Sequence, residues 1–81
     1  MTLNVKFFAI VKDRAGVGEL SLELPDGATV ATAGRAIVQR FPALAEFERR
    51  VAYAVNREYA NRETALRDGD ELALIPPVSG G

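Results

Sequence analysis

The sequence predicts a single α+β domain in which one main helix covers one face of a mixed β-sheet. Three observations lead to this class. Short alternations of apolar and polar residues, the pattern of half-buried strands, occur near both ends and in the middle of the chain. Residues 30–40 instead carry apolar side chains at helical spacing. The length of 81 residues and the 48% share of hydrophobic residues suit one small globular domain.

Two strands are expected before the helix. In LNVKFFAIV, residues 3–11, a period of two puts Phe8 and Ile10 on the face opposite Leu3, Val5, Phe7 and Ala9. In ELSLEL, residues 19–24, leucines alternate with polar residues, which predicts a strand with one solvent-facing side. The segment between them, KDRAGVG, contains glycines, and we expect it to be the loop of a hairpin.

The main helix is expected from about Val30 to Arg40. Thr29 can act as its N-cap, because a hydroxyl oxygen at that position accepts a hydrogen bond from the first turn. Gly34 lies inside the helix, where glycine is unfavourable by about 1 kcal/mol, so we expect it to allow a close approach to the sheet. Pro42 ends the helix, and residues 43–50 could form one or two further helical turns.

Three more strands are expected in the second half of the chain. VAYAV, residues 51–55, alternates again, and a turn at residues 56–58 leads to a very short strand at Tyr59-Ala60. A turn at residues 67–70 opens the last strand, ELALI, residues 71–75. Ile75 then lies on the face opposite Leu72 and Leu74.

Composition argues against most kinds of active site. The chain has no histidine and no cysteine, so the commonest general base, thiol nucleophiles and thiolate metal sites are excluded. Ten basic and 11 acidic residues are interspersed, which predicts no nucleic-acid or membrane surface. No signal peptide and no membrane-spanning stretch is recognisable, so a cytoplasmic location is expected. We therefore expect a chain that is not catalytic alone and binds no metal or cofactor.

The last six residues, PPVSGG, form a distinctive segment. Pro76 and Pro77 have no backbone donor, so the last strand should not continue past Ile75. An extended path would carry the terminal carboxylate up to about 20 Å from the sheet. The last two residues are glycines, which have no side chain and so allow close approach of the backbone to another surface. A partner that activates the carboxylate of Gly81 would explain this design.

A second indication of partners is the group of Phe8, Ile10 and Ile75. If the helix covers the opposite face, these large apolar side chains lie on the uncovered side of the sheet and mark an interface. Alternatively, the short second helix or a loop covers them.

Four stretches together carry a resemblance to a known family: VKFFA, LPDGATV, AVNREYA and DGDELALIPPVSGG. The sequence resembles the small subunit of molybdopterin synthase along essentially its whole length, most specifically in its final segment. The resemblance implies a ubiquitin-like β-grasp fold of about five strands, with the first and last strands parallel at the centre of the sheet. It divides the chain into a β-grasp domain, residues 1–76, and a flexible tail, residues 77–81.

The resemblance also implies a function in molybdenum cofactor biosynthesis. A ubiquitin-activating-like enzyme, using ATP and magnesium, would adenylate the carboxylate of Gly81. Sulfur transfer would then give a thiocarboxylate. Inside a complex with the large catalytic subunit, expected to contain two small and two large subunits, the sulfur would pass to cyclic pyranopterin monophosphate and give molybdopterin.

Site residues follow from the same resemblance. Phe8, Tyr59 and Ile75 would contact the large subunit, although Tyr59 is more polar than expected there, and Lys12 matches a basic position of the first loop. The residues entering the partner's channel would be Pro77, Val78, Ser79 and Gly80. Three alternatives remain: the sulfur carrier of thiamin thiazole synthesis, a ubiquitin-like protein modifier joined through Gly81 to lysines, and a plain interaction module.

Overall fold

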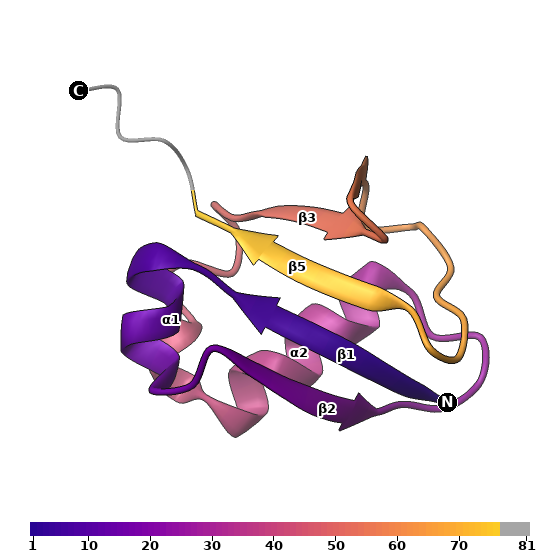
Figure 1. Ribbon diagram of the computed structural model, residues 1–81, viewed down its shortest axis with the longest axis horizontal. Coiled ribbons are helices and arrows are strands. Elements are labelled where there is room, and N and C mark those ends of the chain that lie inside the picture. The colour runs from indigo at the N-terminus through magenta and orange to yellow at the C-terminus, as the bar shows by residue number, and fades with distance from the viewer. Residues whose placement is uncertain (77–81) are drawn as a thin grey trace.

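The computed structural model describes residues 1–76, which form a five-stranded mixed sheet with the strand order β2-β1-β5-β3-β4 (Figure 1). The tail assigned to residues 77–81 lies outside the described residues. In chain order the elements are β1 (Thr2–Phe7), α1 (Ala9–Ala15), β2 (Glu19–Glu23), α2 (Val30–Arg40), the 3₁₀-helix η1 (Pro42–Leu44), β3 (Ala52–Val55), β4 (Glu58–Ala60) and β5 (Glu71–Ile75). Among residues 1–76, no helix is long and apolar enough to cross a membrane.

The sheet is built around the pairing of β1 with β5. These two strands run parallel, whereas β1 with β2, β5 with β3 and β3 with β4 are antiparallel. The first and last strands of the chain therefore lie side by side at the centre of the sheet, as the resemblance implied. All five strands were expected from the sequence, four from alternation and the very short β4 from the turn before it, and this expectation is confirmed.

The core lies between one face of the sheet and α2, which crosses behind the sheet in Figure 1. Every second residue of β1 and β5 points toward α2, and the apolar stripe of α2 packs against these side chains. The completely buried side chains of this layer include Leu3, Val5, Val30, Ala33, Ile37 and Leu72. Burying such side chains is the main stabilising contribution in a small domain.

Helix α2 begins and ends where the sequence predicts. The Thr29 hydroxyl accepts a hydrogen bond from the Thr32 backbone N–H, and the Thr32 hydroxyl accepts one from the Thr29 N–H, both at 3.4 Å. This reciprocal capping satisfies two donors of the first turn. Gly34 faces the sheet as predicted: a Cβ at this position would lie 2.7 Å from the Tyr53 hydroxyl and 2.8 Å from Glu48 Oε1.

The first strand is shorter than predicted, and the predicted loop contains a helix. β1 ends at Phe7, and residues 9–15 form α1, which buries Val11. Ala9 has φ of 49°, which turns the chain out of the sheet, and Gly16, with φ of 82°, ends the helix. The alternation therefore stops one residue after Phe7, and Ile10 belongs to α1 instead of the open face of a strand.

The segment after α2 is less helical than predicted. It contains the 3₁₀-helix Pro42–Leu44, and hydrogen-bonded turns follow up to residue 50. Leu44 is buried, and it fixes this segment beside α2 on the core side of the sheet. This segment therefore does not cover the face of the sheet that points away from α2, and Phe8 remains exposed there.

Candidate functional site

The open face of the sheet carries a row of side chains whose arrangement follows from the strand register. Lys6 pairs with Ala73, Ala73 with Ala54, and Ala54 with Tyr59, so these four residues cross the sheet side by side. The two alanines occupy the middle of the row and the two long side chains its ends. The surface is therefore hollowed in the middle of the row, because the methyl groups of the alanines fill much less space than the side chains of Lys6 and Tyr59.

This hollow has a volume of about 380 Å³ and is open to solvent. We call it the sheet hollow; its lining is formed by Lys6, Phe8, Ala54, Arg57, Tyr59, Glu71, Ala73 and Ile75. Phe8 and Tyr59 are 46% and 78% exposed. Large apolar and aromatic groups that are exposed together around a concave surface are typical of protein interaction sites.

Phe8 reaches this face because of the sharp end of β1. It has extended dihedral angles, φ −132° and ψ 152°, and serves as the N-cap residue of α1 without a side-chain cap bond. Since Lys6 already points to the open face, Phe8 continues the alternation onto the same side. Phe7 pairs with Leu74, which brings Phe8 beside Ile75 at the end of the sheet where β5 also ends.

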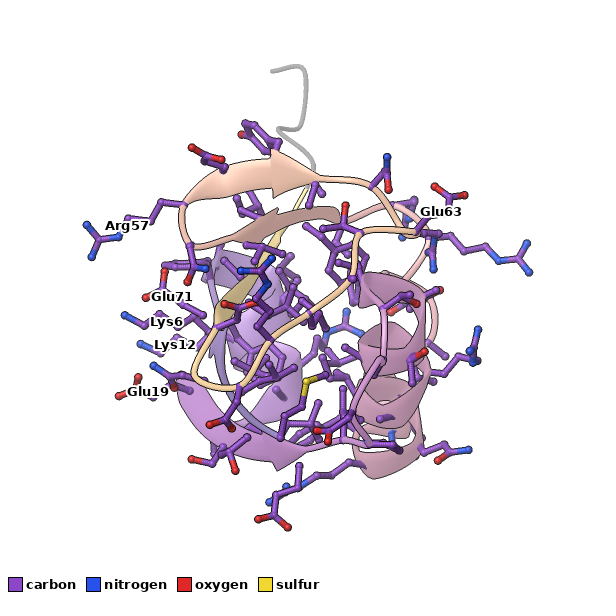
Figure 2. All side chains as sticks on the ribbon, turned by 90° about the vertical axis from the view of Figure 1, so that its right-hand side faces the viewer. Lys6, Lys12, Glu19, Arg57, Glu63 and Glu71 are labelled. Carbon is purple, nitrogen blue, oxygen red and sulfur yellow. The ribbon has the colours of Figure 1, made fainter. Side chains whose placement is uncertain are left out.

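Charged side chains border the opposite end of the sheet hollow. The Glu71 carboxylate lies 3.2 Å from Lys6 Nζ and 3.9 Å from Arg57 Nε. Figure 2 shows the three residues on the side of the sheet away from α2. Glu71 is the least exposed of them, with 24% of its side chain accessible, whereas Arg57 is at 86%. The hollow therefore has an apolar end and an end with two cations around one carboxylate.

Arg57 occupies this position at a cost in backbone energy. Asn56 and Arg57 form the two-residue loop of the β3–β4 hairpin, and both have positive φ, 51° and 71°. Such loops favour asparagine first and glycine second, because only glycine avoids the clash of Cβ in this region. Asn56 is well suited, since its side chain bonds Asp70 and the Glu71 N–H. Arg57 is not, and strained residues of this kind tend to gather at functional sites.

A second hollow, lined in part by two lysines, lies on the other side of Phe8. Lys12, on α1, shares a hollow of about 430 Å³ with Lys6, Phe8 and Glu19, among others. Phe8 therefore forms a ridge between two hollows, with Lys6 common to both. Lys12 lies beside the predicted interface, although on a helix instead of the expected loop.

The structure brings together three of the residues singled out from the sequence, Phe8, Tyr59 and Ile75, and places Lys12 next to them. Gly81 and residues 77–80 lie outside the described part of the chain. Sequence reasoning missed Lys6, Arg57, Glu71 and the two alanines. Part of this set could have been found, because Glu71 and Ala73 alternate with Leu72 and so share the face of Ile75.

Comparison with known proteins places these features in a family. The model of the ThiS family matches residues 5–81. The chain belongs to this family. Its relatives include the molybdopterin synthase sulfur carrier subunit of Chlamydomonas reinhardtii, which is 41% identical over 100% of both chains. The resemblance found in the sequence is therefore confirmed.

Solved structures agree with this assignment. SAMP1, the small archaeal modifier protein 1 of Haloferax volcanii, superposes with a TM-score of 0.91 at 34% identity and covers 100% of both chains. The complex of subunits 1 and 2 of the Helicobacter pylori molybdopterin-converting factor contains a chain with a TM-score of 0.72 and 30% identity, again over 100% of both. The fold is thus the ubiquitin-like β-grasp, as expected.

Proposed function

We propose that this chain is the sulfur carrier subunit of a molybdopterin synthase. The observation that carries the proposal is the full-length likeness to proteins of that name, at 41% identity for the first of them. The described residues supply the parts that such a carrier needs, namely a stable small domain and an exposed apolar hollow. The apolar end of the hollow lies at Ile75, the last residue of β5, immediately before the segment PPVSGG.

The chemistry would take place at the carboxylate of Gly81. The carboxylate attacks the α-phosphorus of ATP, whose charge is balanced by magnesium, and pyrophosphate leaves. Hydrosulfide released by a sulfur donor then attacks the acyl carbon, AMP leaves, and loss of the proton on sulfur gives the thiocarboxylate. ATP and magnesium belong to the activating enzyme in this scheme. The carrier contributes a narrow segment that a tunnel can admit, because Gly80 and Gly81 have no side chain.

The sheet hollow would dock the large catalytic subunit. Phe8, Ile75 and the ring of Tyr59 offer the apolar contacts, and Lys6, Arg57 and Lys12 select for an acidic border on the partner. The same face would be offered to the activating enzyme, so that the two partners bind in turn. Two carriers and two large subunits would form the working assembly, and the sulfur would pass from Gly81 to cyclic pyranopterin monophosphate.

A reconstitution experiment tests this proposal. The full chain is incubated with ATP, magnesium and an adenylating enzyme of the sulfur-carrier class, and exchange of labelled pyrophosphate into ATP is measured. We expect exchange with the full chain and none with a variant that lacks Gly80 and Gly81. Equal exchange with both variants, or none with either, would contradict the assignment of Gly81. Pairing of the product with a thiazole-forming enzyme instead of a large pterin subunit would assign the carrier to thiamin synthesis.

A second candidate function is protein modification. The specific observation in its favour is the TM-score of 0.91 with a protein named a small archaeal modifier. In that case activated Gly81 would form an isopeptide bond with lysine amines of other proteins. Expression of a tagged chain in its own cells, followed by denaturing electrophoresis, distinguishes the two functions, since only a modifier gives a ladder of covalent conjugates that disappears when Gly81 is deleted.

A further inference from the structure

A second surface lies on the opposite side of the molecule, between α2 and the turns that follow η1. It consists of two hollows of about 530 and 280 Å³ that share Arg35 and Glu48. The larger is completed by Arg49 and Arg62, and the smaller by Val38, Gln39 and Ala45. We call the two together the arginine groove. The two sites do not overlap, because α2 covers the face of the sheet away from the sheet hollow and the linings share no residue.

The groove concentrates positive charge in a chain whose formal net charge is −1. Its three arginines come from three different segments, α2, the turn after η1 and the loop after β4. Among the residues that the structure describes, Glu48 alone contributes a carboxylate to its lining. Arg62 donates hydrogen bonds to Glu48 Oε1 at 2.7 Å and to the Glu48 carbonyl at 3.0 Å. This pairing holds the pKa of Glu48 below its usual value, so the carboxylate is ionised at neutral pH and its charge is paired with that of Arg62.

Arg62 is held in place, whereas the other two arginines are available. The Arg62 guanidinium also lies over the Tyr53 ring, 5.8 Å from its centroid, which fixes its orientation further. Within residues 1–76, neither Arg35 nor Arg49 has a hydrogen-bond or ion-pair partner for its side chain. Two exposed guanidinium groups thus share the groove with one that is already paired, and each can donate two parallel hydrogen bonds to a carboxylate.

The composition of the groove indicates what kind of ligand fits. A free inorganic anion would use the arginines but leave the half formed by Val38 and Ala45 empty. A polypeptide segment with carboxylate side chains and a neighbouring apolar side chain would use both halves. We propose that the arginine groove binds an acidic, partly apolar segment of a partner protein, at a surface that shares no lining residue with the sheet hollow. This inference goes beyond the proposed sulfur transfer and does not depend on it.

The test uses the isotope-labelled full chain and three probes. The first is a short synthetic peptide, blocked at both ends, in which leucine and glutamate alternate; the second has glutamine in place of glutamate; the third is inorganic phosphate. Backbone amide shifts are followed by NMR during titration. We expect saturable shifts at residues 34–39, 45–50 and 62 with the acidic peptide only, and weaker binding as salt rises, since exposed charges are screened.

Variants define the contribution of the arginines. Arg35→Glu together with Arg49→Glu should weaken binding of the acidic peptide about tenfold or more, because two exposed ion pairs are replaced by repulsion. Arg40→Glu, on the same helix but stacked on Phe41 outside the groove, is the matched control and should bind as the wild type does. If the double variant is poorly folded, Arg49→Glu alone, in an exposed turn, gives the same comparison.

Four outcomes would overturn the proposal. These are the absence of saturable shifts in the groove, equal binding of the glutamine peptide, equal weakening by Arg40→Glu, and phosphate shifts at the same residues that prevent the peptide from binding. The last would make the groove a site for small anions. Loss of Gly80 and Gly81 should leave peptide binding unchanged, so failure of the proposed sulfur transfer can be told apart from failure of this inference.

Discussion

Gly34→Ala tests the close approach of α2 to the side chains of Tyr53 and Glu48. Gly34 lies in the interior of α2, where alanine alone would be more favourable by about 1 kcal/mol. The structure predicts the opposite result, because a Cβ would lie 2.7 Å from the Tyr53 hydroxyl and 2.8 Å from Glu48 Oε1. Neither atom can move freely. Tyr53 is 4% exposed, and Glu48 is held by Arg62.

The size of the effect follows from these constraints. Overpacking in a well-packed region costs about 1–3 kcal/mol. Displacing the Tyr53 hydroxyl from Glu48 would add part of the cost of an unpaired buried donor, about 1–3 kcal/mol in full. After the helical gain is subtracted, we expect the free energy of unfolding to fall by about 1–3 kcal/mol. For a domain of this size each kcal/mol corresponds to about 4–8 °C in melting temperature.

Thermal and urea unfolding of Gly34→Ala, followed by circular dichroism, measure this loss. Tyr53→Phe is the matched background, because it removes one of the two atoms that the new methyl group meets. The cost of Gly34→Ala should be smaller in that background than in the wild type. A melting temperature that stays the same or rises in Gly34→Ala would refute the reasoning, since helix propensity would then be the dominant effect.

Three further predictions concern the hairpin, the acid response and the docking face. Arg57→Gly should raise the free energy of unfolding by about 0.5–1 kcal/mol, because glycine removes the strain of the left-handed conformation. The lost ion pair with Glu71 should contribute little, because Arg57 is exposed. A lower free energy of unfolding in urea would show that the conformation of Arg57 is not strained. The pKa of Glu48 is lowered in the folded state, so its contribution to stability is present above the usual value of 4.5 and is lost as the pH falls below it. Glu48→Gln should therefore be less stable than the wild type at neutral pH, and its melting temperature should fall less between about pH 5 and pH 3. An equal fall in melting temperature for the variant and the wild type over that range would exclude this role of Glu48. Phe8→Asp should change stability little, because Phe8 is half-exposed, but should weaken binding of the large subunit about a hundredfold or more by burying an unpaired charge; undiminished affinity by calorimetry would remove Phe8 from the interface.

Much of the fold could be predicted because its signals are local. Strand alternation, the Thr29 cap and the proline after α2 each depend on a few neighbouring residues, and the bounds of α2 and of the strands after β1 agree with the structure to within one residue. Helix α1 was missed for a physical reason. Its apolar residues extend the alternation of β1 without a break, and the end of the strand depends on Ala9, whose left-handed conformation no local preference of alanine favours.

The candidate site was predictable only where it coincides with sequence alternation or with the resemblance. Phe8 and Ile75 could be assigned to the open face from the period of two. The sheet hollow could not, because it is created by the register that aligns Ala54 with Ala73 across two strands distant in sequence. The arginine groove was invisible for the same reason, since Arg35, Arg49 and Arg62 are brought together only by packing of three separate segments.

The proposed function requires that Gly81 carries sulfur. The most direct test is the mass of the chain isolated from its own cells, measured first natively and then under denaturing conditions. We expect a population in which one oxygen atom has been exchanged for sulfur at the C-terminal glycine, and which is weighed natively together with a larger pterin-binding subunit. An unmodified carboxylate and no such partner, in cells that produce the molybdenum cofactor, would contradict it.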